Sequence, residues 1–294
     1  MAKSDFLARL AEGEVLVADG ATGTNLQKRG LPVGAAAELW VLENPSAVLD
    51  LGKDFVAAGS QVLLTCTFGA TRLRLEASGL GEQFDFINRQ AVDLARQAIG
   101  QQAVFLAGSI GPLGHMLEPF GDVAVDDAEK TFKDQAQVLM DAGVDLIVVE
   151  TQFDINEAQA AVRAVRKVSS DLPLVCSFSY DRGKRTMMGV SPAAMAKAMA
   201  GLDVDVFGIN CGRSLAENLD NLQQLRSVTD KPLWFKPNAG MPEMDNDGKP
   251  TYSVSPQEMG ALVPHWLQAG AQVVGGCCGT SPEHLAEIAR AARS

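Results

Sequence analysis

The chain has 294 residues, of which 47% are hydrophobic and 21% are charged, and its formal net charge is −11. This length and apolar content suffice to bury one large core. The acidic balance argues against nucleic acid as a partner, because phosphate backbones attract basic surfaces. No run of about 18 apolar residues occurs, so we expect no membrane-spanning segment.

The first residues, MAKSDFLARLAEGE, predict a short amphipathic helix, because Phe6, Leu7 and Leu10 fall on one helical face. They lack the long apolar run and the cleavage site of a secretory signal peptide. The five cysteines of the chain are odd in number and unevenly spaced. That pattern favours metal-binding or catalytic thiols in a reducing compartment over a disulfide scaffold, so we expect a cytoplasmic protein.

Eight short runs of apolar and β-branched residues then alternate with longer helical patterns. The predicted strands cover residues 14–19, 61–66, 103–109, 145–151, 173–179, 205–211, 232–238 and 272–277. Their continuous apolar character suits parallel strands that are buried on both faces.

The helices between these strands carry recognisable start signals. Three pairs match the capping box, in which the first side chain accepts a backbone N–H and the Glu reaches back: Asp154 with Glu157, Ser214 with Glu217, and Ser255 with Glu258. Proline follows serine at a predicted first helical position in three places: Pro192, Pro256 and Pro282.

This alternation predicts an α/β protein, a single (β/α)₈ TIM barrel that spans residues 1–294 and includes the N-terminal helix. The alternative is an open doubly wound sheet. The segment DGATGTNL (19–26), which follows the first strand, does not fit the GxGxxG loop expected of a dinucleotide-binding sheet, so the barrel is favoured.

Active sites of such barrels lie at the C-terminal ends of the strands, where Cys211, Cys277 and Cys278 fall. Two adjacent cysteines in a strand point to opposite faces and cannot converge on one atom. The flanking glycines 275, 276 and 279 would let the strand break, because glycine permits positive φ and tight bends. The three cysteines could then supply thiolates to one Zn²⁺ and leave its fourth position open, as in catalytic zinc sites.

Three other interpretations of the segment GGCCGT remain open at this stage. It could be a tight turn with two buried thiols, or it could hold a vicinal disulfide between Cys277 and Cys278. A phosphate site is the third, because the next helix begins at Ser281 and Pro282 and helix N-termini bind anions. The phosphate interpretation gives the cysteines no purpose.

The motifs in combination resemble the homocysteine S-methyltransferase family. GINCG around Cys211 and GGCCGT around Cys277 and Cys278 are similar to its zinc motifs, and DGATGTNLQ (19–27) is similar to its first-strand motif. The resemblance covers nearly the whole chain. The segments most similar to the homocysteine-binding module of cobalamin-dependent methionine synthase are ETQFD (150–154), TCTF (65–68) and KPNAGMP (236–242).

The resemblance implies a zinc-dependent enzyme that binds the thiol of homocysteine and methylates it to give methionine. It also implies that Asp19 and Glu150 hold the substrate ammonium, although either could instead cap a helix or be an exposed loop acid. Backbone N–H groups near Ala21 could bind the carboxylate. Asn210 is a further candidate for the substrate site. Both Asn210 and Asn238 lie beside the predicted metal ligands and are candidates for orienting them through hydrogen bonds.

The remaining thiols and histidines are predicted to have structural roles. Cys66 is expected to line the site without binding the metal, and Cys176 to lie in the core of the fifth strand. Surface or helix-capping roles are expected for His115, His265 and His284, because none has ligand spacing.

The methyl donor is the least determined part. Quaternary ammonium donors are usually bound by aromatic cages, and only 6% of this chain is aromatic. ETQFD also lacks the Tyr that follows the Glu in the betaine enzyme, and the chain shows no folate or cobalamin domain. A separate methylcorrinoid protein is therefore the favoured donor, approaching through an open barrel mouth. Betaine or S-methylmethionine, in a pocket walled by Trp40 and Phe68, is the alternative. A non-catalytic zinc- or thiol-binding protein is the alternative from another class.

Overall fold

The computed structural model describes residues 4–244 and 250–293. Its main sheet has eight parallel strands in the order β1-β10-β7-β6-β5-β4-β3-β2. The strands are β1 (Leu16–Val17), β2 (Val62–Leu64), β3 (Phe105–Ile110), β4 (Leu146–Gln152), β5 (Leu174–Phe178), β6 (Val206–Cys211), β7 (Leu233–Pro237) and β10 (Ala271–Val274). A parallel bridge between Ala18 and Val62 joins the two ends of the sheet. The strands therefore enclose a barrel, which confirms the predicted TIM barrel and excludes the open sheet.

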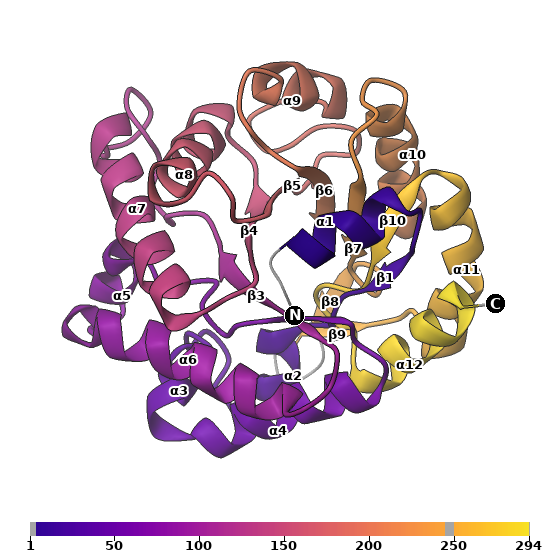
Figure 1. Ribbon diagram of the computed structural model, residues 1–294, viewed down its shortest axis with the longest axis horizontal. Coiled ribbons are helices and arrows are strands. Elements are labelled where there is room, and N and C mark those ends of the chain that lie inside the picture. Colours follow the sequence, from indigo (N-terminus) through magenta and orange to yellow (C-terminus); the bar gives the residue numbers. More distant parts are fainter. Residues whose placement is uncertain (1–3, 245–249, 294) are drawn as a thin grey trace.

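The helices form a ring outside the strands (Figure 1). They are α2 (Thr22–Lys28), α3 (Leu39–Glu43), α4 (Pro45–Ala57), α5 (Arg72–Ala77), α6 (Phe84–Ile99), α7 (Val125–Ala142), α8 (Ile155–Val168), α9 (Pro192–Met199), α10 (Leu215–Arg226), α11 (Pro256–Gln268) and α12 (Pro282–Ala292), with a 3₁₀ turn at Gly81–Gln83. An antiparallel hairpin of β8 (Pro242–Met244) and β9 (Pro250–Tyr252) follows β7. Within the described ranges, no helix is long and apolar enough to cross a membrane.

The predicted N-terminal helix is α1 (Ser4–Ala11), and it packs against the inside of the barrel. Phe6 and Leu10 are buried in one apolar cluster with side chains of the strands, among them Phe105 and Trp234. The rings of Phe6 and Phe105 meet edge to face, with centroids 5.5 Å apart. Because this cluster draws mainly on the first residues of the strands, α1 closes the N-terminal end of the barrel and leaves the opposite end for the site.

The predicted helices begin where expected, but only some of the predicted capping boxes form both of their hydrogen bonds. Ser255 forms a complete capping box with Glu258. Asp154 caps α8, yet Glu157 does not return the bond there, because its carboxylate accepts the backbone N–H of Leu113 at 2.6 Å. At the start of α12 the ring of His284 takes the place of the Glu and accepts the backbone N–H of Ser281 at 3.2 Å. This confirms the capping role expected for His284.

Candidate metal centre and substrate cleft

The ends of β6 and β10 bring three thiols together. Cys211 is the last residue of β6, while Cys277 and Cys278 lie in the loop after β10. The sulfur atoms of Cys211 and Cys277 are 2.9 Å apart, and all three sulfurs lie within 4.8 Å of one another. Among the residues that the structure describes, this is the one group of at least three His, Cys, Asp or Glu side chains that could hold a metal ion. All five cysteines are free thiols, so the vicinal disulfide is excluded.

The glycines beside Cys277 and Cys278 serve two different purposes. Gly279 has a φ of +84°, which is the left-handed conformation expected from the sequence. Gly275 and Gly276 do not adopt positive φ, and that expectation is wrong for them. A Cβ on Gly275 would lie 2.8 Å from the carbonyl oxygen of Asp19, and a Cβ on Gly276 would overlap the Thr280 side chain. Gly275 allows the loop to pass close to the end of β1, and Gly276 allows the loop to fold back against Thr280.

Two residues other than glycine adopt left-handed backbone at this edge of the barrel: Thr151, with φ +60°, and Cys211, with φ +58°. Such a conformation costs about 1–3 kcal/mol per residue and persists only where the surroundings enforce it. The backbone N–H of Thr151 donates to Asn210 Oδ1 at 2.9 Å, and Asn218 Nδ2 donates to the Cys211 carbonyl at 2.7 Å. These bonds hold β4 and β6 in the geometry that turns Cys211 toward the other thiols.

Asn210 connects the metal-binding thiols to the barrel. Its Nδ2 lies 3.5 Å from the sulfur of Cys211, 3.8 Å from that of Cys277 and 2.7 Å from Thr151 Oγ1, and its Oδ1 accepts the Ser177 hydroxyl at 2.6 Å. The side chain is fully buried. This geometry favours the role of orienting the thiols over direct contact with a substrate.

Asn238 is the second asparagine beside the thiols. Its Nδ2 donates to the Gly212 carbonyl at 2.7 Å, while its buried Oδ1 has no partner among the described atoms. The three soft sulfur donors themselves are a set that suits Zn²⁺.

The three thiols share their protons unequally when no cation is bound. Hydrogen bonds to Cys277 and Cys278, together with burial, raise the pKa of Cys211. The hydrogen bonds that Cys278 accepts from Cys211 and Cys277 lower the pKa of Cys278. A divalent cation bound by the three sulfurs would allow all three to lose their protons.

A cleft of about 600 Å³ opens beside the thiols. Its floor contains Asp19 and Glu150, as expected, and also Lys236, which the sequence interpretation overlooked. The Lys236 ammonium lies 2.5 Å from Asp19 Oδ1, and the backbone N–H of Leu64 donates to Asp19 Oδ2 at 2.8 Å. The signal for Lys236 was a lone cation at the end of the apolar run PLWFKPN.

Glu150 is the carboxylate of the floor without an ion-pair partner among the described contacts. Its Oε1 accepts the hydroxyl of Ser109 at 2.6 Å. Burial raises the pKa of Glu150 to about 7, against the opposing effect of nearby Lys236. Asp19 and Glu150, which were expected to act alike, therefore differ in their partners. Asp19 is paired with Lys236, whereas the Glu150 carboxylate is available to pair with a substrate cation.

The backbone N–H of Ala21 is not free to bind the substrate carboxylate, as had been expected of the amides near it. The N–H of Ala21 donates to the carbonyl of Thr280 at 3.1 Å, so this amide is already used. Ala21 itself lines the cleft, next to the start of α2. A carboxylate bound here would need a donor other than the Ala21 N–H.

The far side of the cleft lacks an aromatic cage. Phe68 lines it, as expected, but Trp40 is buried in the core and does not. Phe68 is the one aromatic side chain among the described residues of the lining, and the Arg74 guanidinium already lies 5.3 Å from the centre of its ring. Cys66 also lines this side, and burial followed by the charge of Glu38 raises its pKa, so it stays a neutral thiol. Its predicted place is confirmed.

The sequence interpretation also missed Glu38. This buried acid accepts the backbone N–H of Gly69 at 2.5 Å and so fixes the segment 34–38 beside the cleft. No sequence signal distinguished it from an exposed acid.

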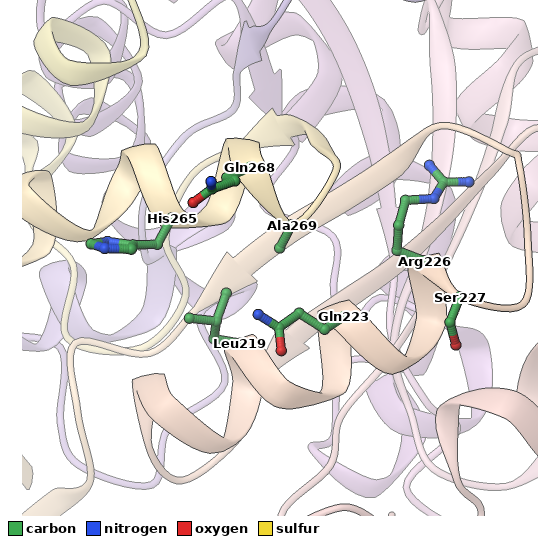
Figure 2. Close-up of a pocket in the computed structure, with 7 residues that line it drawn as sticks. All are labelled: Leu219, Gln223, Arg226, Ser227, His265, Gln268 and Ala269. Carbon is green, nitrogen blue, oxygen red and sulfur yellow. The ribbon is translucent and has the colours of Figure 1, made fainter.

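The other residues set aside in the sequence lie away from the cleft. Cys176 is buried in the core of β5, as expected. His265 lies in a groove of about 340 Å³ between α10 and α11, whose lining side chains are shown in Figure 2. Apart from His265, the groove is lined by Leu219, Gln223, Arg226, Ser227, Gln268 and Ala269. With no acid or thiol among these residues, the groove is not the candidate site.

The phosphate interpretation of the last loop also finds no support. Glu283 lies in the first turn of α12, and its carboxylate is 2.5 Å from the Ser281 hydroxyl. A negative side chain therefore occupies the helix end where an anion would bind.

Comparison with known proteins agrees with this geometry. A family model described as homocysteine S-methyltransferase matches residues 16–292. Methionine synthases from Mycobacterium leprae and Mycobacterium tuberculosis are each 28% identical over 304 aligned positions, which cover 98% of this chain. The chain spans about a quarter (25%) of the length of these relatives.

A solved structure of similar size is the homocysteine methyltransferase MmuM from Escherichia coli in its metallated form. It has a TM-score of 0.81 and 27% identity, and the match covers 98% of this chain and 99% of that one. Because the family model covers nearly the whole barrel, including the strand ends that carry the three thiols, the chain belongs to the homocysteine S-methyltransferase family.

Proposed function

We propose that this chain is a zinc-dependent homocysteine S-methyltransferase that forms methionine. The observation that carries the proposal is the convergence of Cys211, Cys277 and Cys278 at the edge of a cleft whose floor holds Glu150. The homocysteine methyltransferase MmuM, which is similar over nearly its full length, has been solved in a metallated form, and this supports a bound metal in this chain as well. Zinc bound there would supply the positive charge that keeps a substrate thiol ionised near neutral pH.

The residues of the cleft divide the work of holding homocysteine. Glu150 binds the ammonium, since its carboxylate has a hydroxyl donor in Ser109 and no ion-pair partner among the described contacts. Lys236 forms a buried ion pair with Asp19 beside the substrate position. Asn210 orients two of the three metal-binding thiols. Together they align the substrate sulfur with the open cleft.

The reaction that follows is a nucleophilic substitution. The homocysteine sulfur donates an electron pair to the methyl carbon, a new sulfur–carbon bond forms, and the bond to the donor breaks, with its electron pair leaving on the donor. No acid is needed at the substrate sulfur, because it enters the step as a thiolate. The chain's task is to exclude competing orientations of the thiolate.

We infer a methylcorrinoid protein as the methyl donor. The observation in its favour is the absence of an aromatic cage around the described part of the cleft, where Phe68 alone is aromatic and already faces Arg74. A small donor such as S-methylmethionine or betaine is the second candidate. The volume of about 600 Å³ favours it, since clefts of this size accommodate ligands larger than one amino acid.

A donor screen tests the proposal. Three reactions each contain zinc-loaded protein and homocysteine together with one donor: a methylcorrinoid protein, S-methylmethionine or betaine. Methionine formation is measured in each reaction. We expect methionine with the corrinoid donor. Methionine from a small donor alone would replace the inferred donor and keep the enzyme. Zinc and homocysteine binding without turnover on any donor would indicate the non-catalytic binding protein.

A further inference from the structure

The end of β7 and the loop that follows it contact the backbone of every cysteine in the thiol cluster. Each residue of the segment 237–239 makes one backbone hydrogen bond to one cysteine: Pro237 accepts from Cys277 at 2.9 Å, Asn238 donates to Cys211 at 3.2 Å, and Ala239 donates to Cys278 at 2.9 Å. In the sheet, β7 lies between β6, which ends in Cys211, and β10, which precedes the other two cysteines. Residues 237–239, the bridging segment, therefore join the two parts of the chain that carry the thiols.

Asn238 adds a side-chain hydrogen bond to this connection. Its Nδ2 donates to the Gly212 carbonyl at 2.7 Å, so its backbone and its side chain together hold two consecutive carbonyls, those of Cys211 and Gly212. Both of these residues have left-handed backbone, with φ +58° and +77°. Because this conformation is unfavourable for a cysteine, Cys211 keeps it only where its surroundings enforce it. The two bonds from Asn238 are part of that enforcement.

Asn218 of α10 holds the same turn from another element. Its Nδ2 donates to the Cys211 carbonyl at 2.7 Å, and a Cβ on Gly212 would overlap its Oδ1. The bonds from Asn218 and Asn238 all end on backbone carbonyls, so they do not depend on the protonation of the thiols. Asn238 is not among the residues that line the cleft. It therefore acts on the turn from outside the space that holds the substrate.

We propose that Asn238 is a positioning residue of the metal centre, which fixes the turn at Cys211 and Gly212 against the bridging segment and so sets the place of the Cys211 thiol before a metal binds. The proposal rests on the zinc centre of the proposed function. A metal that binds ligands already held in place does not have to order them, so groups that orient the ligands contribute to metal affinity. Without the side chain of Asn238, Cys211 can relax from its left-handed conformation and move its sulfur away from the other two.

The chain offers a matched control in Asn221. Its Nδ2 also donates to a glycine carbonyl, that of Gly183 in the loop after β5, at 3.0 Å. Its buried Oδ1, like that of Asn238, has no partner among the described atoms. Asn238→Ala and Asn221→Ala therefore each remove one amide and one bond to a glycine carbonyl, but only the first bond holds a residue next to a metal-binding cysteine.

The experiment measures two properties of the metal centre. Zinc affinity is measured by competition with a chromogenic chelator, and the geometry of the site by the visible absorption of the Co²⁺-substituted protein. Loss of a group that orients a metal ligand typically lowers metal affinity about 10–100-fold. We expect a loss of that size and a changed cobalt spectrum in Asn238→Ala, with wild-type values in Asn221→Ala.

Thermal melting of the metal-free proteins checks that the variants fold. If Asn238→Ala does not fold, Asn238→Leu and Asn221→Leu replace the pair, because leucine keeps the size of the side chain and removes the donor. The inference is overturned if the variant at position 238 binds zinc as tightly as wild type with an unchanged cobalt spectrum, or if the variant at position 221 loses as much affinity. A wild-type protein that binds no zinc would instead overturn the zinc centre itself, so the two failures are distinct.

Discussion

Lys236 and Asp19 form an ion pair on the floor of the cleft, with Lys236 Nζ 2.5 Å from Asp19 Oδ1 and side chains that are 4% and 2% exposed. The pair joins the end of β7 to the second residue after β1, across the strand β10 that lies between them. It leaves Glu150 as the acid that can respond to a substrate ammonium.

Removal of Lys236 should destabilise the fold strongly. Lys236→Met would leave Asp19 as an uncompensated buried charge, which costs about 3–5 kcal/mol of the free energy of unfolding. The double variant Lys236→Met, Asp19→Asn removes both charges and should recover much of this loss. Urea denaturation of the two variants checks the prediction, and equal stability of wild type and Lys236→Met would contradict it.

Glu150→Gln should weaken homocysteine binding without affecting zinc. A hydrogen bond to a charged group is worth about 1.5–3 kcal/mol, so the affinity should fall about tenfold to a hundredfold. Calorimetric titration of homocysteine into the zinc-loaded variant measures this. Glu43→Gln, which changes an exposed acid, is the control and should bind as wild type does. An unchanged affinity in Glu150→Gln would remove Glu150 from the site.

The pH dependence of binding should reflect the ionisation of Glu150. Burial raises its pKa from 4.5 to about 7, and an ammonium binds the carboxylate rather than the neutral acid. The ratio of wild-type to Glu150→Gln affinity should therefore increase as the pH rises through about 7, and this ratio cancels the ionisation of the substrate thiol. A ratio that stays constant between about pH 6 and 8 would exclude this assignment.

The raised pKa of Glu150 also affects how the free energy of unfolding depends on pH. The direction is opposite to that of an ion-paired acid, whose pKa is lowered in the folded state. The folded state keeps a proton on Glu150 at pH values at which the unfolded chain has lost it. The group therefore contributes stability below about pH 4.5 that is lost as the pH rises through about 7. Glu150→Gln should lack this component of the stability profile.

Betaine alone should yield negligible methionine. The reason is the cleft lining, in which Phe68 is the one aromatic among the described residues and its face is taken by Arg74. The measurement is methionine formation from betaine and homocysteine by zinc-loaded protein. Turnover at ordinary enzyme rates, roughly 1 s⁻¹ or more, would reverse the donor assignment and leave the metal centre unaffected.

Much of the fold could be predicted from the sequence because its signals are local. Continuous apolar strands, prolines after serines and the amphipathic first helix each depend on a few neighbouring residues, and the structure confirms all three. The meeting of Cys211 with Cys277 and Cys278 followed from one further rule, that parallel strands of a barrel end at the same edge.

The parts that were missed depend on contacts between distant segments. Lys236 and Asp19 are 217 residues apart, and their pairing requires the closed barrel. The need for glycine at position 275 comes from the passing backbone of Asp19, which the sequence around the cysteines does not reveal.

The central claim is that Cys211, Cys277 and Cys278 together hold one zinc ion, and metal analysis of purified variants tests it most directly. Wild type should contain about one zinc per chain, while Cys277→Ala should lose most of it, because two thiolates without the third make a poor zinc site. Cys66→Ala, which changes a cleft thiol outside the cluster, should retain zinc. The predicted result is that Cys277→Ala loses zinc and Cys66→Ala does not. Full retention of zinc in Cys277→Ala would contradict the account.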